Sequence, residues 1–216
     1  RKIDCLGVQP LDVMVTGVTG AGKSTTLNTF FQKYVAKVGD GVDPETMELD
    51  AYSLNDYLRL WDTPGLGDGV DKDEIHKKKI TELLNKTYTS DGREYGFIDM
   101  VLVIIEGTNR DMGTTYKILN DVIVPNISKY RILVLINQAD MAMKGRHWDY
   151  KLNKPDKVLL EFLDKQVSSI KERVKEATGV QILKPVYYSA EYGYNVEKVF
   201  DFIIENMPID RRKIRR

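Results

Sequence analysis

The chain has 216 residues, with 32 basic and 32 acidic side chains and a formal net charge of zero. This length suits one α/β domain with a full core and is short for two, and the balanced charge gives no global reason to expect a nucleic-acid or membrane partner. A single cysteine, Cys5, excludes an internal disulfide framework, and no apolar run of about 18 residues is present. We therefore expect a cytoplasmic protein.

The first predicted strand is Leu11–Thr16, and a helix is predicted from Ser24 to Val35. Between them, Gly17–Ser24 reads GVTGAGKS and matches the phosphate-binding pattern G-x-x-x-x-G-K-[ST]. Glycines allow successive backbone N–H groups to surround a polyphosphate. Lys23 would reach the β- and γ-phosphates, and Ser24 would place its hydroxyl on Mg²⁺. The predicted phosphate-binding residues are Thr19, Gly20, Ala21, Gly22, Lys23, Ser24 and Thr25.

Between Lys37 and Ser53 the periodicity is weak, and Gly39, Gly41 and Pro44 interrupt the chain. We predict a mobile loop there, followed by a short edge strand around Met47–Tyr52. The next predicted strand is Asp56–Trp61, and Asp62-Thr63-Pro64-Gly65 follows it. An acidic residue at a strand tip beside a phosphate loop can hold the Mg²⁺ shell, and the Gly65 N–H can meet a γ-phosphate.

Further along, Met100–Ile105 and Arg131–Ile136 are aliphatic runs typical of strands buried on both faces, and Val186–Tyr188 is a shorter candidate. Apolar stripes predict a helix over 160–174, with Asn153 and Pro155 near its start and Gly179 past its end. A second stripe predicts a helix over 196–207, with Asn195 as N-cap and Pro208 after it. The segment 141–156 has no regular period and is predicted as an inserted surface loop. The alternation predicts a three-layer α/β fold with a mostly parallel six-stranded sheet and one antiparallel edge strand.

Two motifs follow the last strands. Asn137-Gln138-Ala139-Asp140 fits N-[KQ]-x-D, in which the Asp140 carboxylate can accept from the N1–H and N2–H₂ groups of guanine. Asn137 would brace the phosphate loop, and Gln138 would cover the purine face. Ser189 and Ala190 follow the last strand, where the Ala190 N–H would donate to guanine O6.

Taken together, these motifs resemble the translation-factor-related (TRAFAC) P-loop GTPases across roughly residues 11–207. The phosphate loop, Asn137–Asp140 and the downstream Gly145-Arg146-His147-Trp148 look most like the bacterial Era-like group called YfjP/YeeP. The resemblance implies a Ras-like G domain that binds GTP, hydrolyses it and depends on Mg²⁺. It also implies that Thr46 closes on Mg²⁺ and the γ-phosphate, which makes Ser24, Thr46 and Asp62 the metal residues and Lys23, Thr46 and Gly65 the catalytic ones.

The hydrolytic machinery departs from that pattern. Leu66 stands where the best-known small GTPases carry the glutamine that orients the attacking water. Our hypothesis is slow intrinsic turnover that rises when a partner or a second copy completes the site. Arg110 is either a finger donated across a dimer or a solvated neighbour of Asp111, which would then act as an N-cap.

Other candidates have plainer interpretations. The run His76–Lys79 is predicted to be a solvated face, and His147 and Trp148 either contact a partner or pin their loop. The basic residues 211–216 either touch anionic lipid or RNA or begin a linker. We expect an N-terminal extension (1–10), a G domain (11–208) and a basic tail (209–216).

The function predicted from the sequence is a slow GTP-hydrolysing switch with an unknown effector or activator. One alternative is a nucleotide-gated module that dimerises through its G domain and uses hydrolysis only as a timer. A second alternative is an ATP-using P-loop enzyme.

Overall fold

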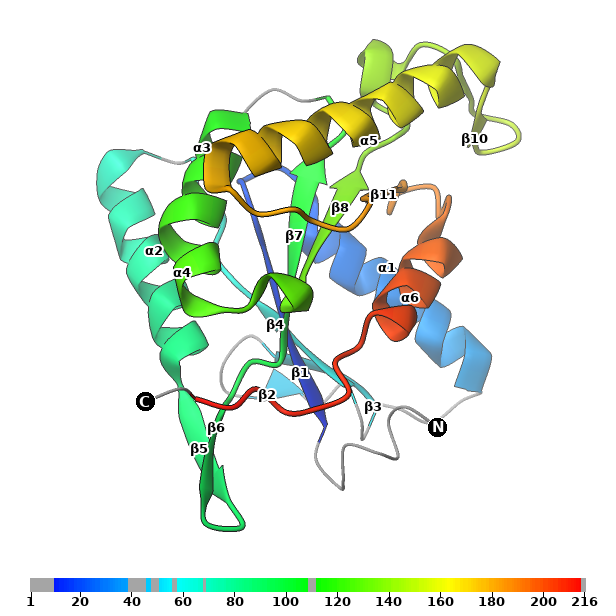
Figure 1. The fold of residues 1–216 in the computed structure, drawn as a ribbon. Helices are drawn as coiled ribbons and strands as arrows, with labels where there is room; N and C mark the ends of the chain where they lie inside the picture. Colours follow the sequence, from blue (N-terminus) through cyan, green and yellow to red (C-terminus); the bar gives the residue numbers. More distant parts are fainter. Residues whose placement is uncertain are drawn as a thin grey trace.

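A computed structural model describes residues 10–38, 46–47, 51–55, 58–67, 69–108 and 112–214. Seven strands form its main sheet, and helices cover both faces (Figure 1). The strands are β1 (Leu11–Gly17), β2 (Thr46–Met47), β3 (Ala51–Asn55), β4 (Leu58–Asp62), β7 (Met100–Glu106), β8 (Ile132–Asn137) and β11 (Val186–Tyr187).

The strand order is β11-β8-β7-β1-β4-β3-β2. The first five are mutually parallel, whereas β3 pairs antiparallel with β4, and β2 pairs antiparallel with β3. The three-layer, mostly parallel fold is therefore confirmed. The predicted count of six strands is one short, because the edge segment predicted at Met47–Tyr52 forms two strands, β2 and β3. The strand predicted at Asp56–Trp61 is observed at Leu58–Asp62, and residues 56–57 lie outside the described part of the chain.

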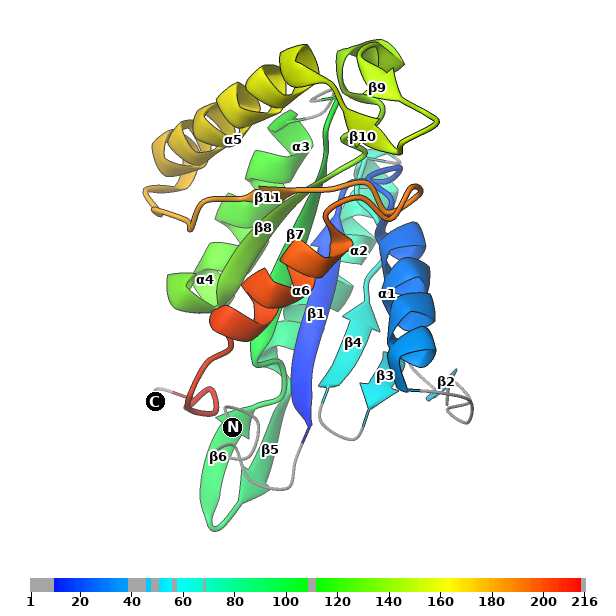
Figure 2. The ribbon, with the colours of Figure 1, turned by 90° about the vertical axis from the view of Figure 1, so that its right-hand side faces the viewer.

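The helices are α1 (Lys23–Val38), α2 (Val70–Asn85), α3 (Met112–Lys117), the π-helical η2 (Ile118–Ile123), α4 (Val124–Asn126), the 3-10 turns η3 (Lys129–Arg131) and η4 (Ala142–Gly145), α5 (Lys157–Thr178) and α6 (Val196–Glu205). On one face of the sheet, α1 and α6 lie together, and the Phe30 and Phe200 ring centroids are 4.6 Å apart. On the other face lie α2, the α3–α4 run and α5 (Figures 1 and 2).

Local signals explain where the two last helices begin and end. Asp156 caps α5 by accepting from the Leu159 N–H at 3.0 Å, and Gly179 ends this helix with φ +70°. The residue before α6 is Asn195, as predicted, but its side chain donates to the Tyr187 carbonyl at 3.1 Å and makes no capping bond. Asn195 thus occupies the predicted N-cap position without forming a capping bond, because its amide instead ties α6 to β11.

The segment 141–156 is more ordered than the predicted surface loop. It contains η4 and the antiparallel pair β9 (Trp148–Asp149) and β10 (Lys154–Pro155). Trp148 is buried, and the His147 imidazole lies 2.7 Å from the Asp156 carboxylate. These contacts confirm that the two residues pin their own segment.

Two hydrophobic cores support the fold. The main core lies between the sheet and the helices, where every residue of β1 is buried. The second core is small and comprises Ala139, Ala142, Trp148, Leu159 and Leu163. Tyr187 packs against both cores, so the second one supports the end of the sheet at which β8 and β11 finish.

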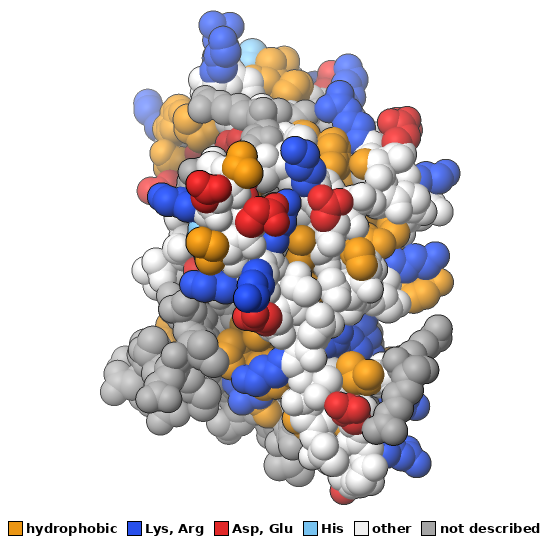
Figure 3. Space-filling model, turned by 90° about the vertical axis from the view of Figure 1, so that its left-hand side faces the viewer, with side chains coloured by type: hydrophobic (Ala, Val, Ile, Leu, Met, Phe, Trp, Pro, Cys, Tyr) orange, Lys and Arg blue, Asp and Glu red, His pale blue; other side chains and the backbone are white. Residues whose placement is uncertain are grey.

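The outer face of α2 carries charges of both signs (Figure 3). Lys77 pairs with Glu74 at 2.8 Å, and Lys78 lies 3.9 Å from Glu82. The exposed Lys78 pair contributes little to stability, and the predicted solvated face is confirmed for Lys78, whereas the Lys77 side chain is half-buried. In the part of the chain that the structure describes, no helix is both long and apolar enough to cross a bilayer.

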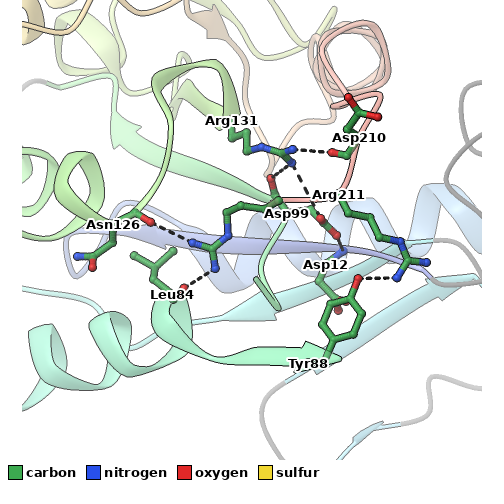
Figure 4. Close-up of polar contacts among 9 residues, drawn as sticks. Asp12, Leu84, Tyr88, Asp99, Asn126, Arg131, Asp210 and Arg211 are labelled. Atoms are coloured by element: carbon green, nitrogen blue, oxygen red, sulfur yellow. Dashed lines mark hydrogen bonds and ion pairs between the residues drawn. The ribbon is translucent and has the colours of Figure 1, made fainter. Parts of the chain in front are cut away.

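Residues 209–214 reach the hairpin of β5 (Thr87–Ser90) and β6 (Arg93–Gly96), where Lys213 forms a β-bridge with Tyr95 (Figure 1). Arg212 is only 8% exposed and donates to the carbonyls of Asn126 and Leu84, while its own carbonyl accepts from the Gly96 N–H. Arg131 donates to the Asp99 carbonyl (Figure 4). Arg212 of the predicted basic tail therefore fills a buried site, and the boundary at residue 208 stays a prediction.

Candidate functional site

The phosphate loop Gly17–Ser24 joins β1 to α1, and its neighbours require glycine at two positions. A Cβ on Gly17 would lie 2.3 Å from the Ile104 carbonyl oxygen. A Cβ on Gly22, which has φ +82°, would lie 2.3 Å from Asn137 Nδ2. Ile104 of β7 and Asn137 of the Asn137–Asp140 motif therefore hold the loop closely on two sides.

The Lys23 side chain folds toward the start of this loop. Its ammonium donates to the carbonyl oxygens of Gly17 and Val18, both at 3.3 Å, and the side chain is buried. Ser24 and Thr25 are exposed in the first turn of α1. The Lys23 ammonium and the N-terminus of α1 therefore lie in one short segment. Both favour negative charge, so this segment is suited to bind an anion.

The predicted sensor segment Asp62–Gly65 lies directly beside the loop. Asp62 ends β4 opposite Val15 of β1. A Cβ on Gly65 would lie 2.6 Å from Thr19 Oγ1 and 2.9 Å from Lys23 Nζ. The structure therefore brings together Lys23, Asp62 and Gly65, the three residues that the sequence assigns to phosphate, metal and γ-phosphate.

Leu66 does not point toward this space. Its side chain is 1% exposed and belongs to the main core, and its carbonyl accepts from the Thr19 N–H at 2.7 Å. Next to it, His76 of α2 places Nδ1 2.7 Å from the Gly65 carbonyl oxygen. The prediction that His76 is solvated is thus wrong, because the imidazole is half-buried against the sensor segment, whereas Lys78 and Lys79 are exposed.

Thr46 is not brought to the loop. It lies in β2, where it pairs with Tyr52, and β3 and β4 separate this strand from β1. Three strand spacings amount to about 14 Å, so the metal role of Thr46 stays a prediction that requires its segment to move. Arg110, Asp111 and the breaker residues at 39, 41 and 44 lie outside the described residues.

Asn137, the last residue of β8, connects three parts of the site. Its Nδ2 donates to the Ala21 carbonyl at 3.0 Å, and its Oδ1 accepts from the Ala190 N–H at 3.0 Å. The predicted bracing of the phosphate loop is present in this structure. The Ala190 N–H is engaged here, so its predicted donation to guanine O6 requires a shared or exchanged bond.

A cleft of about 360 Å³ opens beside this connection, lined by Gly22, Thr25, Glu106, Thr108, Asn137, Gln138, Asp140, Met141, Glu191 and Tyr192. Gln138 reaches from the cleft to the phosphate loop, where its Nε2 donates to the Gly20 carbonyl at 2.7 Å. Asp140 is 5% exposed, and its Oδ1 is buried without a hydrogen-bond partner among the described residues. A buried acceptor of this kind calls for a donor from a ligand.

Several residues of this region escaped the sequence reasoning. Thr26 Oγ1 donates to the Gly22 carbonyl at 2.7 Å and lies 2.7 Å from the hydroxyl of Tyr188, whose pKa is raised by complete burial. Tyr192 lines the cleft. Desolvation raises the pKa of the Tyr192 hydroxyl, and the nearby Asp140 carboxylate raises it further. The available signal was the run of tyrosines around the Ser189-Ala190 pair.

Comparison with known families identifies the chain at this point. A family model described as "50S ribosome-binding GTPase" matches residues 12–138, which is more than half of the chain and includes the phosphate loop and Asp62–Gly65. The chain belongs to this GTPase family. Among curated proteins, GTPase Der of Rickettsia akari is 25% identical over 94% of the chain, and GTPase HflX of Caldanaerobacter subterraneus subsp. tengcongensis is 27% identical over 86%. The chain spans 40% and 42% of their lengths.

Solved structures show the same fold. GDP-bound aIF5B from Aeropyrum pernix superposes with a TM-score of 0.61 and 16% identity over 91% of the chain and 35% of that protein. A GTP-binding protein from Sulfolobus solfataricus in complex with GDP gives 0.57 and 18% over 91% of the chain and 52% of that protein. The Ras-like G domain is therefore confirmed for this member of the GTPase family, and the finer resemblance to the YfjP/YeeP group stays a prediction.

Proposed function

We propose that this GTPase-family chain binds GTP and GDP and hydrolyses GTP to GDP and phosphate as a nucleotide-dependent switch. The observation that carries the proposal is the buried Asp140 carboxylate in a cleft that continues to the phosphate loop at Gly22. Guanine offers two adjacent N–H donors to such a carboxylate, whereas adenine offers no matching pair on that edge. Guanine is therefore the expected base.

The donor set at the phosphate end suits Mg²⁺. Ser24 supplies a hydroxyl at the start of α1, and Asp62 supplies a carboxylate at the adjacent end of β4. Mg²⁺ prefers hard oxygen ligands and is usually held by one or two protein groups together with phosphate oxygens and water. When bound, the ion would neutralise charge that develops on the phosphates. Thr46 would join this set only in the GTP state.

The chain's own contribution to hydrolysis is positioning and charge. Lys23 places a cation at the loop, and Gly65 lies directly beside that ammonium, where its N–H would be the donor to the γ-phosphate. Leu66 is buried and offers no polar group to water. We therefore propose intrinsic turnover on the order of 10⁻⁴ to 10⁻² s⁻¹, which a partner or a second copy accelerates.

The base assignment is tested by titrating the protein with GDP, ADP and xanthosine diphosphate. Asp140→Asn should weaken GDP binding and favour the xanthine nucleotide, whose O2 replaces a donor with an acceptor. Glu191→Gln is the matched control, because it also neutralises a carboxylate that lines the cleft. Unchanged GDP affinity in Asp140→Asn, or equal binding of ADP and GDP by the wild type, would refute guanine recognition.

The switch and its rival are separated by two further measurements. Single-turnover hydrolysis followed against protein concentration should be slow at low concentration, and fast, concentration-independent turnover contradicts the proposed incomplete site. Light scattering with GDP and with a non-hydrolysable GTP analogue tests the nucleotide-gated dimer. A monomer under both conditions removes that alternative.

A further inference from the structure

Four aromatic side chains gather behind and beside the base cleft. Trp148 and Tyr150 come from the β9–β10 segment, and Tyr192 and Tyr194 follow Ala190. The Trp148 ring centroid lies 5.7 Å from that of Tyr192 and 5.4 Å from that of Tyr194. Tyr150 adds a third contact, at 5.8 Å from Tyr192. Rings at these separations attract one another beyond their buried area, so the four side chains form one connected cluster.

Only one described tyrosine of this cluster lines the cleft. Tyr192 does so together with Gln138 and Asp140, and its side chain is half-buried. Tyr194 contacts the same tryptophan and is absent from the cleft's lining residues. Tyr192 therefore presents an aromatic surface to whatever occupies the cleft, while Trp148 supports it from behind.

The same segment also supports the acidic turn. Ala139 and Ala142, on either side of Asp140, pack with Trp148 in the second core. A Cβ placed on Gly145 would lie 3.1 Å from the Tyr150 hydroxyl, so this tyrosine lies against the end of η4. One small core thus positions both the carboxylate and the aromatic surface of the cleft.

We propose that Tyr192 contacts the nucleotide base and sets its affinity, and that Trp148 acts as a positioning residue for Tyr192. The proposal deepens the proposed function and rests on it, because it assumes that the base occupies this cleft. A purine whose polar edge meets Asp140 has its flat apolar surface available to a neighbouring ring. Contacts between bases and aromatic side chains are among the stronger contributions to nucleotide binding.

The test compares GDP with pyrophosphate as ligands in calorimetric titrations. Tyr192→Ala should weaken GDP binding about tenfold or more and leave pyrophosphate binding unchanged, because pyrophosphate has no base. Tyr192→Phe, which keeps the ring, should stay within about threefold of the wild type. Tyr194→Ala is the matched control, because it removes a ring from the same cluster without altering the lining of the cleft.

A separate variant tests the positioning role of Trp148. Trp148→Leu stays apolar but removes the ring behind Tyr192, so GDP affinity should fall several-fold while pyrophosphate affinity holds. Equal GDP affinity in Tyr192→Ala and wild type overturns the inference, and so does an equal loss for Tyr192→Ala and Tyr194→Ala. If the wild-type protein binds pyrophosphate but does not prefer guanine nucleotides over adenine nucleotides, the proposed function fails instead.

Discussion

The Asn137 side-chain amide donates to the carbonyl oxygen of Ala21 at 3.0 Å, across 116 positions of sequence. This bond joins the segment for which we propose base recognition to the loop for which we propose phosphate binding. Because the same side chain also accepts from the Ala190 N–H, one residue fixes the relative position of three loops that come from distant parts of the chain.

Asn137→Ala should destabilise the protein and weaken GDP binding together. The substitution leaves the buried Ala21 carbonyl and Ala190 N–H without their partner, at about 1–3 kcal/mol for each group. Urea denaturation and GDP titration would measure the two effects. Asn206→Ala is the control, because that amide donates to the Phe202 carbonyl one turn away in α6 and not to another loop among the described residues. A similar loss in both variants would contradict a special role for Asn137.

Gly22→Ala should lower stability and GDP affinity by more than the backbone conformation of Gly22 alone explains. A left-handed φ of +82° disfavours alanine by about 1–2 kcal/mol, and the added methyl group would press on Asn137 Nδ2. Gly92→Ala is matched in φ at +70° but has open space around the new methyl group. We expect Gly92→Ala to show only the backbone penalty, with normal GDP binding, and Gly22→Ala to lose GDP affinity. Equal melting temperatures for the two variants would argue against the steric account.

Arg212→Ala should lower the free energy of unfolding by about 2–4 kcal/mol, because one buried and one half-buried carbonyl lose their donor. The carbonyls belong to Leu84 and Asn126, at the ends of α2 and α4. Lys213→Ala, at the exposed neighbouring position, should change stability by about 0.5 kcal/mol or less. Chemical denaturation of both variants tests the contrast, and a harmless Arg212→Ala would show that residues 209–214 are a loose tail after all.

Asp99 should make stability depend on pH in the acidic range. Burial raises its pKa above the ordinary value of 3.8, despite the nearby Arg131 guanidinium. The folded state therefore keeps this proton at a higher pH than the unfolded state, and the contribution to stability falls as pH rises from about 3.8 through the raised pKa. Melting curves of wild type and Asp99→Asn across this window should show the wild type losing stability relative to the variant. A constant difference between them would contradict the shift.

The fold and most of the site were predictable because they depend on local signals. Buried parallel strands require unbroken aliphatic runs such as Met100–Ile105, and a phosphate loop requires its glycines and lysine in sequence. Topology then placed Asp62 beside the loop, since both follow the carboxyl ends of neighbouring parallel strands.

What the sequence did not reveal depends on contacts between distant segments. Nothing in the local pattern around Arg212 distinguishes a buried guanidinium from a solvated one, because the difference arises from the ends of α2 and α4. His76 is a similar case, because it lies among charged residues and yet contacts the Gly65 carbonyl. For Trp148 the sequence left a partner contact and pinning of its own loop open, and only its packing in the second core favours the latter.

The second core also bears on how a bound nucleotide would leave. Its few apolar side chains bury far less surface than the main core, so this corner should open by local fluctuation long before the sheet unfolds. Amide hydrogen exchange should then be faster at Ala139 and Ala142 than at the centre of β7. This opening would then limit the rate at which the base dissociates. The lifetime of the bound nucleotide would depend on the residues around Trp148 as much as on the phosphate loop.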